Sequence, residues 1–150
     1  MVAQQSQEIF FTFYQTIEKE TYLFVLLLLG NDEITTKVIE QTMTHCFAQF
    51  SKKGLYSKRL FFRRLVKQCK KQRCFYSSYI VSKSLPISAT QSLEIATKLE
   101  SYSFLKRSYL LLHYVARFSK QDICFILGII HFLFARAVYP IAVFSSWSYQ

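Results

Sequence analysis

The chain has 150 residues, of which 51% are hydrophobic, enough for one domain with a real core or for two small ones. Nineteen Lys and Arg against nine Asp and Glu give a net charge of +10, which favours nucleic acid or an anionic surface as the partner. No C-x-x-C pair occurs among the four cysteines, and the N-terminal residues have neither a basic segment nor an early apolar run. We therefore expect no zinc site, no secretory signal, and reduced thiols in a cytoplasmic protein.

The first half of the chain predicts long helices. Apolar residues recur at helical spacing within residues 7–29, and Gly30 is a typical stop after such a run. A second apolar face, from Val38 to Phe50, predicts another helix beginning near Asp32. Threonines lower its helix propensity, so tertiary packing must hold it. These patterns, with few Gly and Pro in the chain, predict an all-α fold.

A strongly basic stretch follows. Ten of the nineteen Lys and Arg residues lie within residues 52–73, and no acidic residue occurs within residues 41–93. From Arg59 onward the stretch is predicted to be helical, because apolar residues at i, i+4 and i+8 from Phe61 make one stripe and basic residues cover the rest. An ordinary solvated face mixes both signs of charge, so this helix is expected to meet a polyanion.

The pattern changes again after Phe75. Residues 76–91 are rich in serine, contain a proline and have few helix formers, which predicts a linker. The linker would divide the chain into an N-terminal module, residues 1–75, and a C-terminal one, residues 92–150. One or two helices are predicted within residues 92–117.

The C-terminal module carries a recognisable motif. Ser119 three residues before Asp122 predicts a helix start, and Gly128 predicts a sharp turn after that helix. We expect a further helix to follow. A helix, a glycine turn and a second helix make a helix-turn-helix, which typically binds DNA.

The order of these features resembles that of the small sigma factors of bacterial RNA polymerase, of the extracytoplasmic-function type. The best match is FSKQDICFILGI, residues 118–129, which is similar to the family pattern Leu-Ser-x-x-Glu-Ile-Ala-x-x-Leu-Gly-Ile. The resemblance implies a transcription initiation factor that binds core RNA polymerase and directs it to promoter DNA. It also implies an anti-sigma regulator as a further partner, no cofactor and no small-molecule substrate.

Two weaker matches lie in the N-terminal module. LLLLGNDEITTKVIEQTMTHCF is similar to the segment with which the family binds the polymerase clamp, although Thr36 and Lys37 stand where acids are usual. FFRRLVKQCKKQR is similar to the promoter-melting segment, with Gln68 at a position usually held by Asn. The resemblance implies these polymerase-binding residues: Thr36, Lys37, Glu40 and Gln41.

The expected DNA-binding residues come from the basic helix, its end and the last helix. The basic side chains would contact phosphates, and aromatic rings at the helix end would stack on unpaired bases. The last helix offers few polar residues for reading DNA, which leaves a sigma-like protein without promoter binding as an alternative. The full set is Arg59, Arg63, Arg64, Lys67, Gln68, Lys70, Lys71, Arg73, Phe75, Tyr76, His131 and Arg136.

Two other classes of protein fit the sequence less well. Residues 123–144 are almost uninterrupted apolar sequence, flanked by aromatic residues, and could form a transmembrane helix. Arg136 and His131 near the middle oppose this, because an arginine at the centre of a bilayer costs about 2.5 kcal/mol or more. An enzyme is not expected, because the sequence has no paired carboxylates, no Gly-rich phosphate loop and no metal-ligand spacing.

Overall fold

The computed structural model describes residues 2–53 and 57–128. This part of the chain is all-α, as predicted, and contains no strand. The helices are α1 (Val2–Leu29), α2 (Asp32–Lys53), α3 (Lys58–Lys70), α4 (Ser78–Ser84), α5 (Ala89–Ser101), α6 (Phe104–Tyr114) and α7 (Lys120–Leu127).

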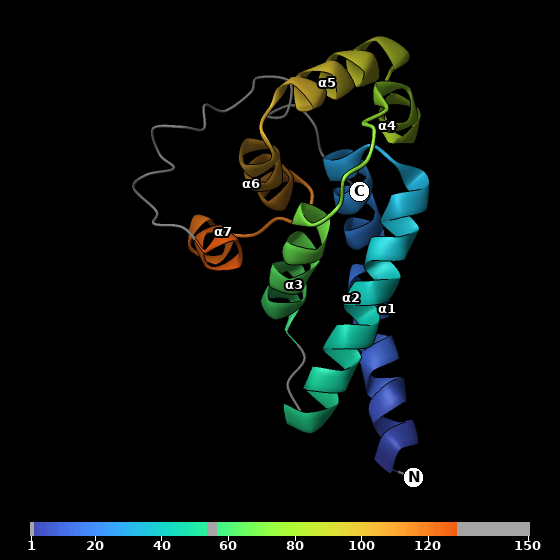
Figure 1. Ribbon diagram of the computed structural model, residues 1–150, viewed down its shortest axis with the longest axis vertical. Coiled ribbons are helices and arrows are strands. Elements are labelled where there is room, and N and C mark those ends of the chain that lie inside the picture. The colour runs from blue at the N-terminus through green and yellow to red at the C-terminus, as the bar shows by residue number, and fades with distance from the viewer. Residues whose placement is uncertain (1, 54–56, 129–150) are drawn as a thin grey trace.

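Helices α1, α2 and α3 pack side by side, and each runs opposite to the one before it (Figure 1). Helices α4 and α5 pack on each other at the end where α1 stops and α2 starts. Helix α6 contacts α1, and α7 lies against α3. The elements before and after residues 76–91 are therefore in direct contact.

A single apolar core contains residues from each of these seven helices. Aromatic rings occupy its centre: Phe62 of α3 stands edge-on to Phe24 of α1 at 5.4 Å and to Phe118 at 5.2 Å between ring centroids. Around them are fully buried aliphatic side chains, which add favourable burial of apolar surface. These include Leu27, Leu28, Leu65, Ile95, Leu99, Leu110, Leu111 and Leu112.

The segment expected to be an irregular linker contains α4. Ser77 caps this helix by accepting a hydrogen bond from the Ile80 amide, and Val81 and Leu85 are buried in the common core. A serine oxygen in this position satisfies a main-chain donor that the first turn leaves without a partner. Serine in this segment therefore caps the start of a helix and is not a sign of irregular structure. The division into two modules stays a prediction, which limited proteolysis of residues 76–91 would test.

The C-terminal end of α1 is bound by groups from distant parts of the chain. Gly30 ends the helix with φ +61°, and a Cβ there would lie 2.5 Å from the ring of Tyr76. The Tyr76 hydroxyl donates to the Leu27 carbonyl at 2.7 Å, and the Arg107 guanidinium donates to the Leu28 carbonyl at 2.6 Å. The last carbonyls of a helix need such donors, so these contacts fix α6 and the start of the 76–91 segment against α1.

The first helix and the glycine turn of the predicted helix-turn-helix lie within the described residues. Ser119 caps α7 by accepting from the Asp122 amide at 3.2 Å, and Gly128 closes the helix with φ +67°. The apolar spacing of the sequence predicts Ile123, Ile126 and Leu127 as the buried face of this helix. Ile123 and Ile126 are buried, whereas Leu127 is half-exposed, which corrects the expectation for that residue. The second helix of the predicted helix-turn-helix lies outside the described residues, and so do His131 and Arg136.

Residues 123–144, the alternative transmembrane segment, continue beyond the described residues, which end at Gly128. Within the described part, no helix has the length and apolar content needed to cross a membrane.

Candidate nucleic-acid interface

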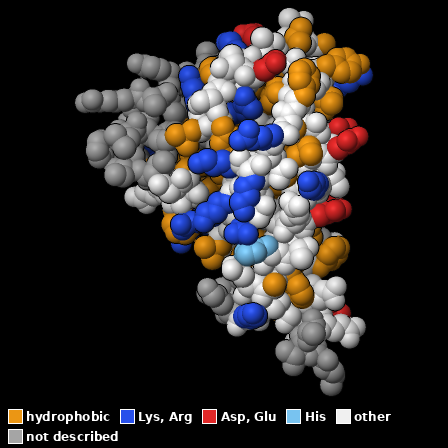
Figure 2. All heavy atoms as spheres, in the orientation of Figure 1, with side chains coloured by type: hydrophobic (Ala, Val, Ile, Leu, Met, Phe, Trp, Pro, Cys, Tyr) orange, Lys and Arg blue, Asp and Glu red, His pale blue; other side chains and the backbone are white. Residues whose placement is uncertain are grey.

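Helix α3 places one apolar face inside and turns its basic residues outward. Ser57 caps its first turn, and the buried side is formed by residues on one stripe of the helix, as the sequence predicted. Figure 2 shows Lys and Arg side chains gathered in a band along α3, with the Asp and Glu side chains of that view lying away from it. The buried residues are Phe61, Phe62, Leu65, Val66 and Cys69.

One edge of α3 faces α7, and its cations have partners there. The Arg59 guanidinium lies 3.5 Å from an Asp122 carboxylate oxygen and 4.3 Å from the centroid of the Phe125 ring. Arg63 approaches the same ring at 4.7 Å. Cation–π contacts and an ion pair hold this edge against α7, so the charge of Arg59 is already partly neutralised.

The other edge of α3 faces α2, and a cavity of about 290 Å³ lies between the two helices. Arg64 is half-buried in it, and its Nε atom is buried without a hydrogen-bond partner in the described structure. Burial lowers the pKa of His45, and the nearby charges of Arg64 and Lys71 lower it further. The lining residues are His45, Cys46, Gln49, Phe50, Leu60, Arg63, Arg64 and Lys67.

The end of α3 continues the basic surface. Lys67, Lys70, Lys71 and Arg73 are exposed, and no salt bridge is recorded for any of them in the described residues. Gln68 is half-buried. These side chains remain available to an anionic partner.

The two aromatic residues predicted at the helix end lie in opposite environments. Phe75 is 82% exposed, which fits a ring that stacks on a base. Tyr76 packs against Gly30, and the Arg107 guanidinium covers its ring at 4.5 Å. Burial raises the pKa of the Tyr76 hydroxyl, which donates into the fold. The structure thus differs from the expectation that both rings are available at this end.

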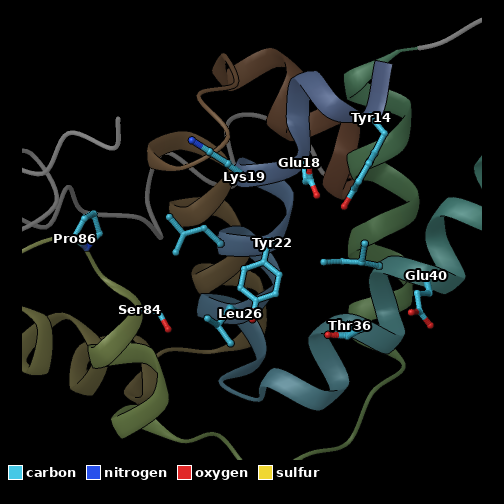
Figure 3. A pocket seen from close by; sticks show the side chains of 11 residues that line it. Tyr14, Glu18, Lys19, Tyr22, Leu26, Thr36, Glu40, Ser84 and Pro86 are labelled. Atoms are coloured by element: carbon cyan, nitrogen blue, oxygen red, sulfur yellow. The ribbon is translucent and has the colours of Figure 1, made fainter. Parts of the chain in front are cut away.

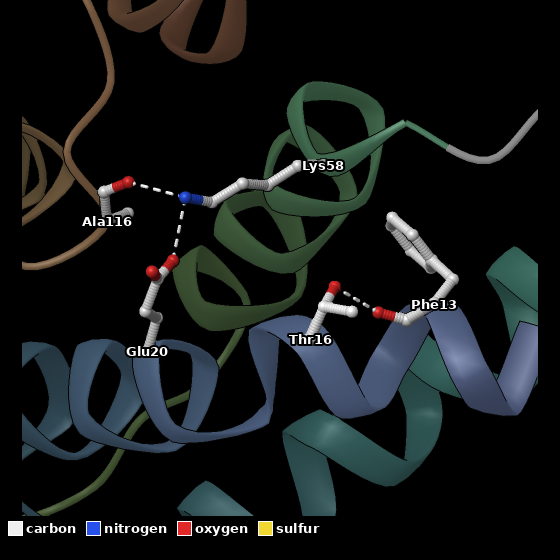
Figure 4. Close-up of polar contacts among 5 residues, drawn as sticks. All are labelled: Phe13, Thr16, Glu20, Lys58 and Ala116. Carbon is white, nitrogen blue, oxygen red and sulfur yellow. Dashed lines mark hydrogen bonds and ion pairs between the residues drawn. The ribbon is translucent and has the colours of Figure 1, made fainter.

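Lys58, which begins the basic helix, is held by contacts within the fold (Figure 4). Its Nζ atom lies 2.7 Å from a Glu20 carboxylate oxygen and donates to the Ala116 carbonyl at 2.7 Å. It also lies 4.8 Å from the Phe118 ring centroid. Lys58 therefore joins α1, α3 and the turn after α6, a role that the charge pattern alone does not reveal.

A second hollow surface lies between α1 and α2. The four predicted polymerase-binding residues are exposed on α2, and two of them, Thr36 and Glu40, line a cavity of about 670 Å³ (Figure 3). Tyr22 of α1 lies in its middle, and Ser84 and Pro86 close one side. Lys37 and Gln41 are not among the lining residues. Sequence reasoning missed the contribution of α1 and of the α4–α5 connection, because neither carries a motif of its own.

No metal centre is formed by the described residues, in which no group of three or more His, Cys, Asp or Glu side chains comes together. No family model matches the chain, and no curated protein or solved structure shows significant similarity to it.

Proposed function

We propose that this protein is a DNA-binding transcription factor of the sigma type, which binds core RNA polymerase through α1 and α2 and promoter DNA through α3. The observation that carries the proposal is the cationic face of α3. Lys67, Lys70, Lys71 and Arg73 are exposed there without acidic partners among the described residues. Such a surface attracts the phosphates of nucleic acid and gains free energy from released counterions.

Phe75 supports a role in handling unpaired bases. Its exposed ring follows the basic helix directly, so a strand whose phosphates contact Lys70 and Lys71 could place a base on it. A promoter-melting factor needs both features together. Phe75→Ala is expected to weaken binding to single-stranded DNA more than binding to duplex, because only unpaired bases expose a face for stacking.

The α1–α2 groove supports the polymerase contact. Its walls carry Tyr14, Tyr22, Leu26 and Ile39, with Glu40 at the rim, and a cavity with this mixture suits a helix of a partner protein. The cap by Ser119 and the left-handed Gly128 support the start of a helix-turn-helix in the C-terminal part.

A pull-down with a bacterial core RNA polymerase tests the proposal. The wild-type protein should retain the polymerase, and Glu40→Lys should weaken retention because it changes the charge at the rim of the groove. Glu8→Lys makes the same charge change at an exposed position of α1 that does not line the groove, so it should behave like wild type.

Failure of the wild-type protein to retain polymerase would contradict the sigma-type function. Retention of polymerase without binding to a promoter-like fork of duplex and single strand would instead support the alternative of a sigma-like protein that does not bind promoters.

A further inference from the structure

The cavity between α2 and α3 has the composition of an anion site. Three basic side chains, Arg63, Arg64 and Lys67, line it together with His45 and Gln49. No acidic side chain is among its described lining residues. Its volume of about 290 Å³ lies at the small end of the range for ligand sites, so a small group fits it better than a large molecule.

Arg64 carries a buried donor that points to a ligand. Its Nε atom is buried and has no hydrogen-bond partner in the described structure, whereas buried donors in proteins are nearly always paired. Leaving a charged donor without an acceptor is costly. An acceptor that carries negative charge and several oxygens would satisfy the guanidinium and the neighbouring Arg63 and Lys67 at once.

We infer that this cavity binds a single phosphate group, held by Arg63, Arg64 and Lys67 of α3 and by His45 of α2. Arginine pairs with phosphate through two parallel hydrogen bonds, and lysine adds a point charge. The phosphate can come from a nucleic-acid backbone, which rests on the proposed function, or from a free phosphate compound, which does not.

His45 gives the site a second property. Burial and the positive charges of Arg64 and Lys71 lower the pKa of its ring, which favours the neutral form. A bound anion would reverse the sign of the local field and favour the protonated ring, which can donate to a phosphate oxygen. Cys46, the other titratable group of α2 at the cavity, has a pKa raised to about 11 by burial and so stays protonated near neutral pH. The charged groups of α3 that face this side of α2 are Arg63, Arg64 and Lys67 in the cavity and Lys71 beyond it.

Binding of inorganic phosphate is the direct test. Calorimetric titration would compare wild type with Arg64→Gln and with Lys83→Gln, at ionic strength held constant with chloride. Lys83 is exposed on α4 and does not line the cavity, so its variant makes the same charge change without touching the site. Arg64→Gln should bind phosphate about tenfold more weakly or worse, since hydrogen bonds to charged groups contribute that much, and Lys83→Gln should bind like wild type.

Two further measurements keep the test decisive if Arg64→Gln folds poorly. Lys67→Gln changes an exposed side chain of the cavity rim, so it should fold normally and still lose phosphate affinity. The His45 ring signal in NMR, identified by its absence in His45→Gln, should titrate at higher pH when sulfate, which does not itself titrate in this range, replaces chloride. Equal phosphate affinity in all variants, or a His45 titration unmoved by sulfate, would overturn the inference.

Competition separates the two sources of phosphate. If inorganic phosphate displaces a fork DNA from wild type but not from Arg64→Gln, the cavity holds a backbone phosphate. If phosphate binds to the cavity without displacing DNA, or if the protein binds no DNA at all, the ligand is a free phosphate compound. In the last case the proposed function fails while the phosphate site stands.

Discussion

The two edges of α3 carry arginines in opposite electrostatic settings. At the edge toward α7, Arg59 faces the Asp122 carboxylate and the ring of Phe125. At the edge toward α2, Arg64 faces His45 and Cys46, and its Nε has no acceptor among the described atoms. Both residues belong to the same basic run in the sequence, yet only one has its charge compensated within the fold.

The difference separates cations that hold the structure together from cations that are left for a ligand. Lys58 and Arg59 join α3 to α1 and to α7, so their charges contribute to packing. Arg64 and Lys67 form no ion pair with any other described residue. Concentrating positive charge along one edge costs free energy through repulsion. A fold that retains this cost at one edge and removes it at the other points to the uncompensated edge as the binding surface.

The largest effect should come from a substitution in the buried core that supports both edges of α3. Phe62 is fully buried and stands edge-on to Phe24 and Phe118, so Phe62→Ala should lower the free energy of unfolding by about 3–5 kcal/mol. Urea unfolding measures the loss. Leu60→Ala, on the exposed side of the same helix, should cost much less. Equal losses in the two variants would show that the burial pattern of α3 is wrong.

A triple substitution of Arg63, Arg64 and Lys67 by Gln tests the uncompensated edge. If these cations neutralise three phosphates, the slope of log affinity against log salt for a promoter-like fork should fall by about two to three units. The measurement is a salt titration of binding by fluorescence anisotropy. Folding should be nearly unchanged, because the described residues form no ion pair with these three side chains and Arg63 gives up only its cation–π contact with Phe125.

The matched control for that measurement replaces Lys83, Lys98 and Lys120 by Gln. The three substitutions make the same change in net charge, at positions on α4, α5 and α7. The control should leave the slope close to that of wild type. A similar fall in both triple variants would mean that DNA senses only net charge and that α3 is not the interface.

The sequence predicted the all-α class, the buried stripe of α3, the stop at Gly30 and the cap at Ser119, because each depends on residues close together in the chain. It did not predict α4, since serines are frequent both in linkers and at helix starts. Ser77 and Ser88 both cap helices, and the core contact of Val81 that holds α4 is made across the fold. The two edges of α3 also could not be predicted, because the partners of Lys58 and Arg59 come from distant elements.

A smaller effect is expected from the compensated edge. Asp122→Asn removes the ion pair with Arg59. The Arg59 side chain is 49% exposed and the Asp122 side chain is 38% exposed, so the free energy of unfolding should fall by no more than about 1 kcal/mol. The same variant should bind DNA somewhat more tightly, because Arg59 is released. A double-mutant cycle with Arg59→Gln, measured by urea unfolding, isolates the pair. A coupling well above about 1 kcal/mol would show that this edge is held far more strongly than an exposed pair can explain.

The smallest effect is the dependence of stability on pH at the uncompensated edge. Because burial and the charges of Arg64 and Lys71 lower the pKa of His45 below its ordinary value of 6.5, the unfolded chain binds a proton at this residue more readily than the folded one. The contribution of His45 to stability is therefore complete above about pH 6.5 and is lost as the pH falls through the lower pKa of the folded state.

Urea unfolding in a phosphate-free buffer, between about pH 5 and pH 7, should show wild type gaining stability with rising pH. His45→Gln should flatten that gain, and Arg64→Gln should reduce it, because it removes one of the causes of the lowered pKa. His113→Gln, on α6 and not among the residues that line the cavity, is the matched control and should keep the wild-type gain. If His45→Gln follows the wild-type curve throughout, then the positive charges of this edge do not act on His45, and the contrast between the two edges of α3 is weaker than the structure indicates.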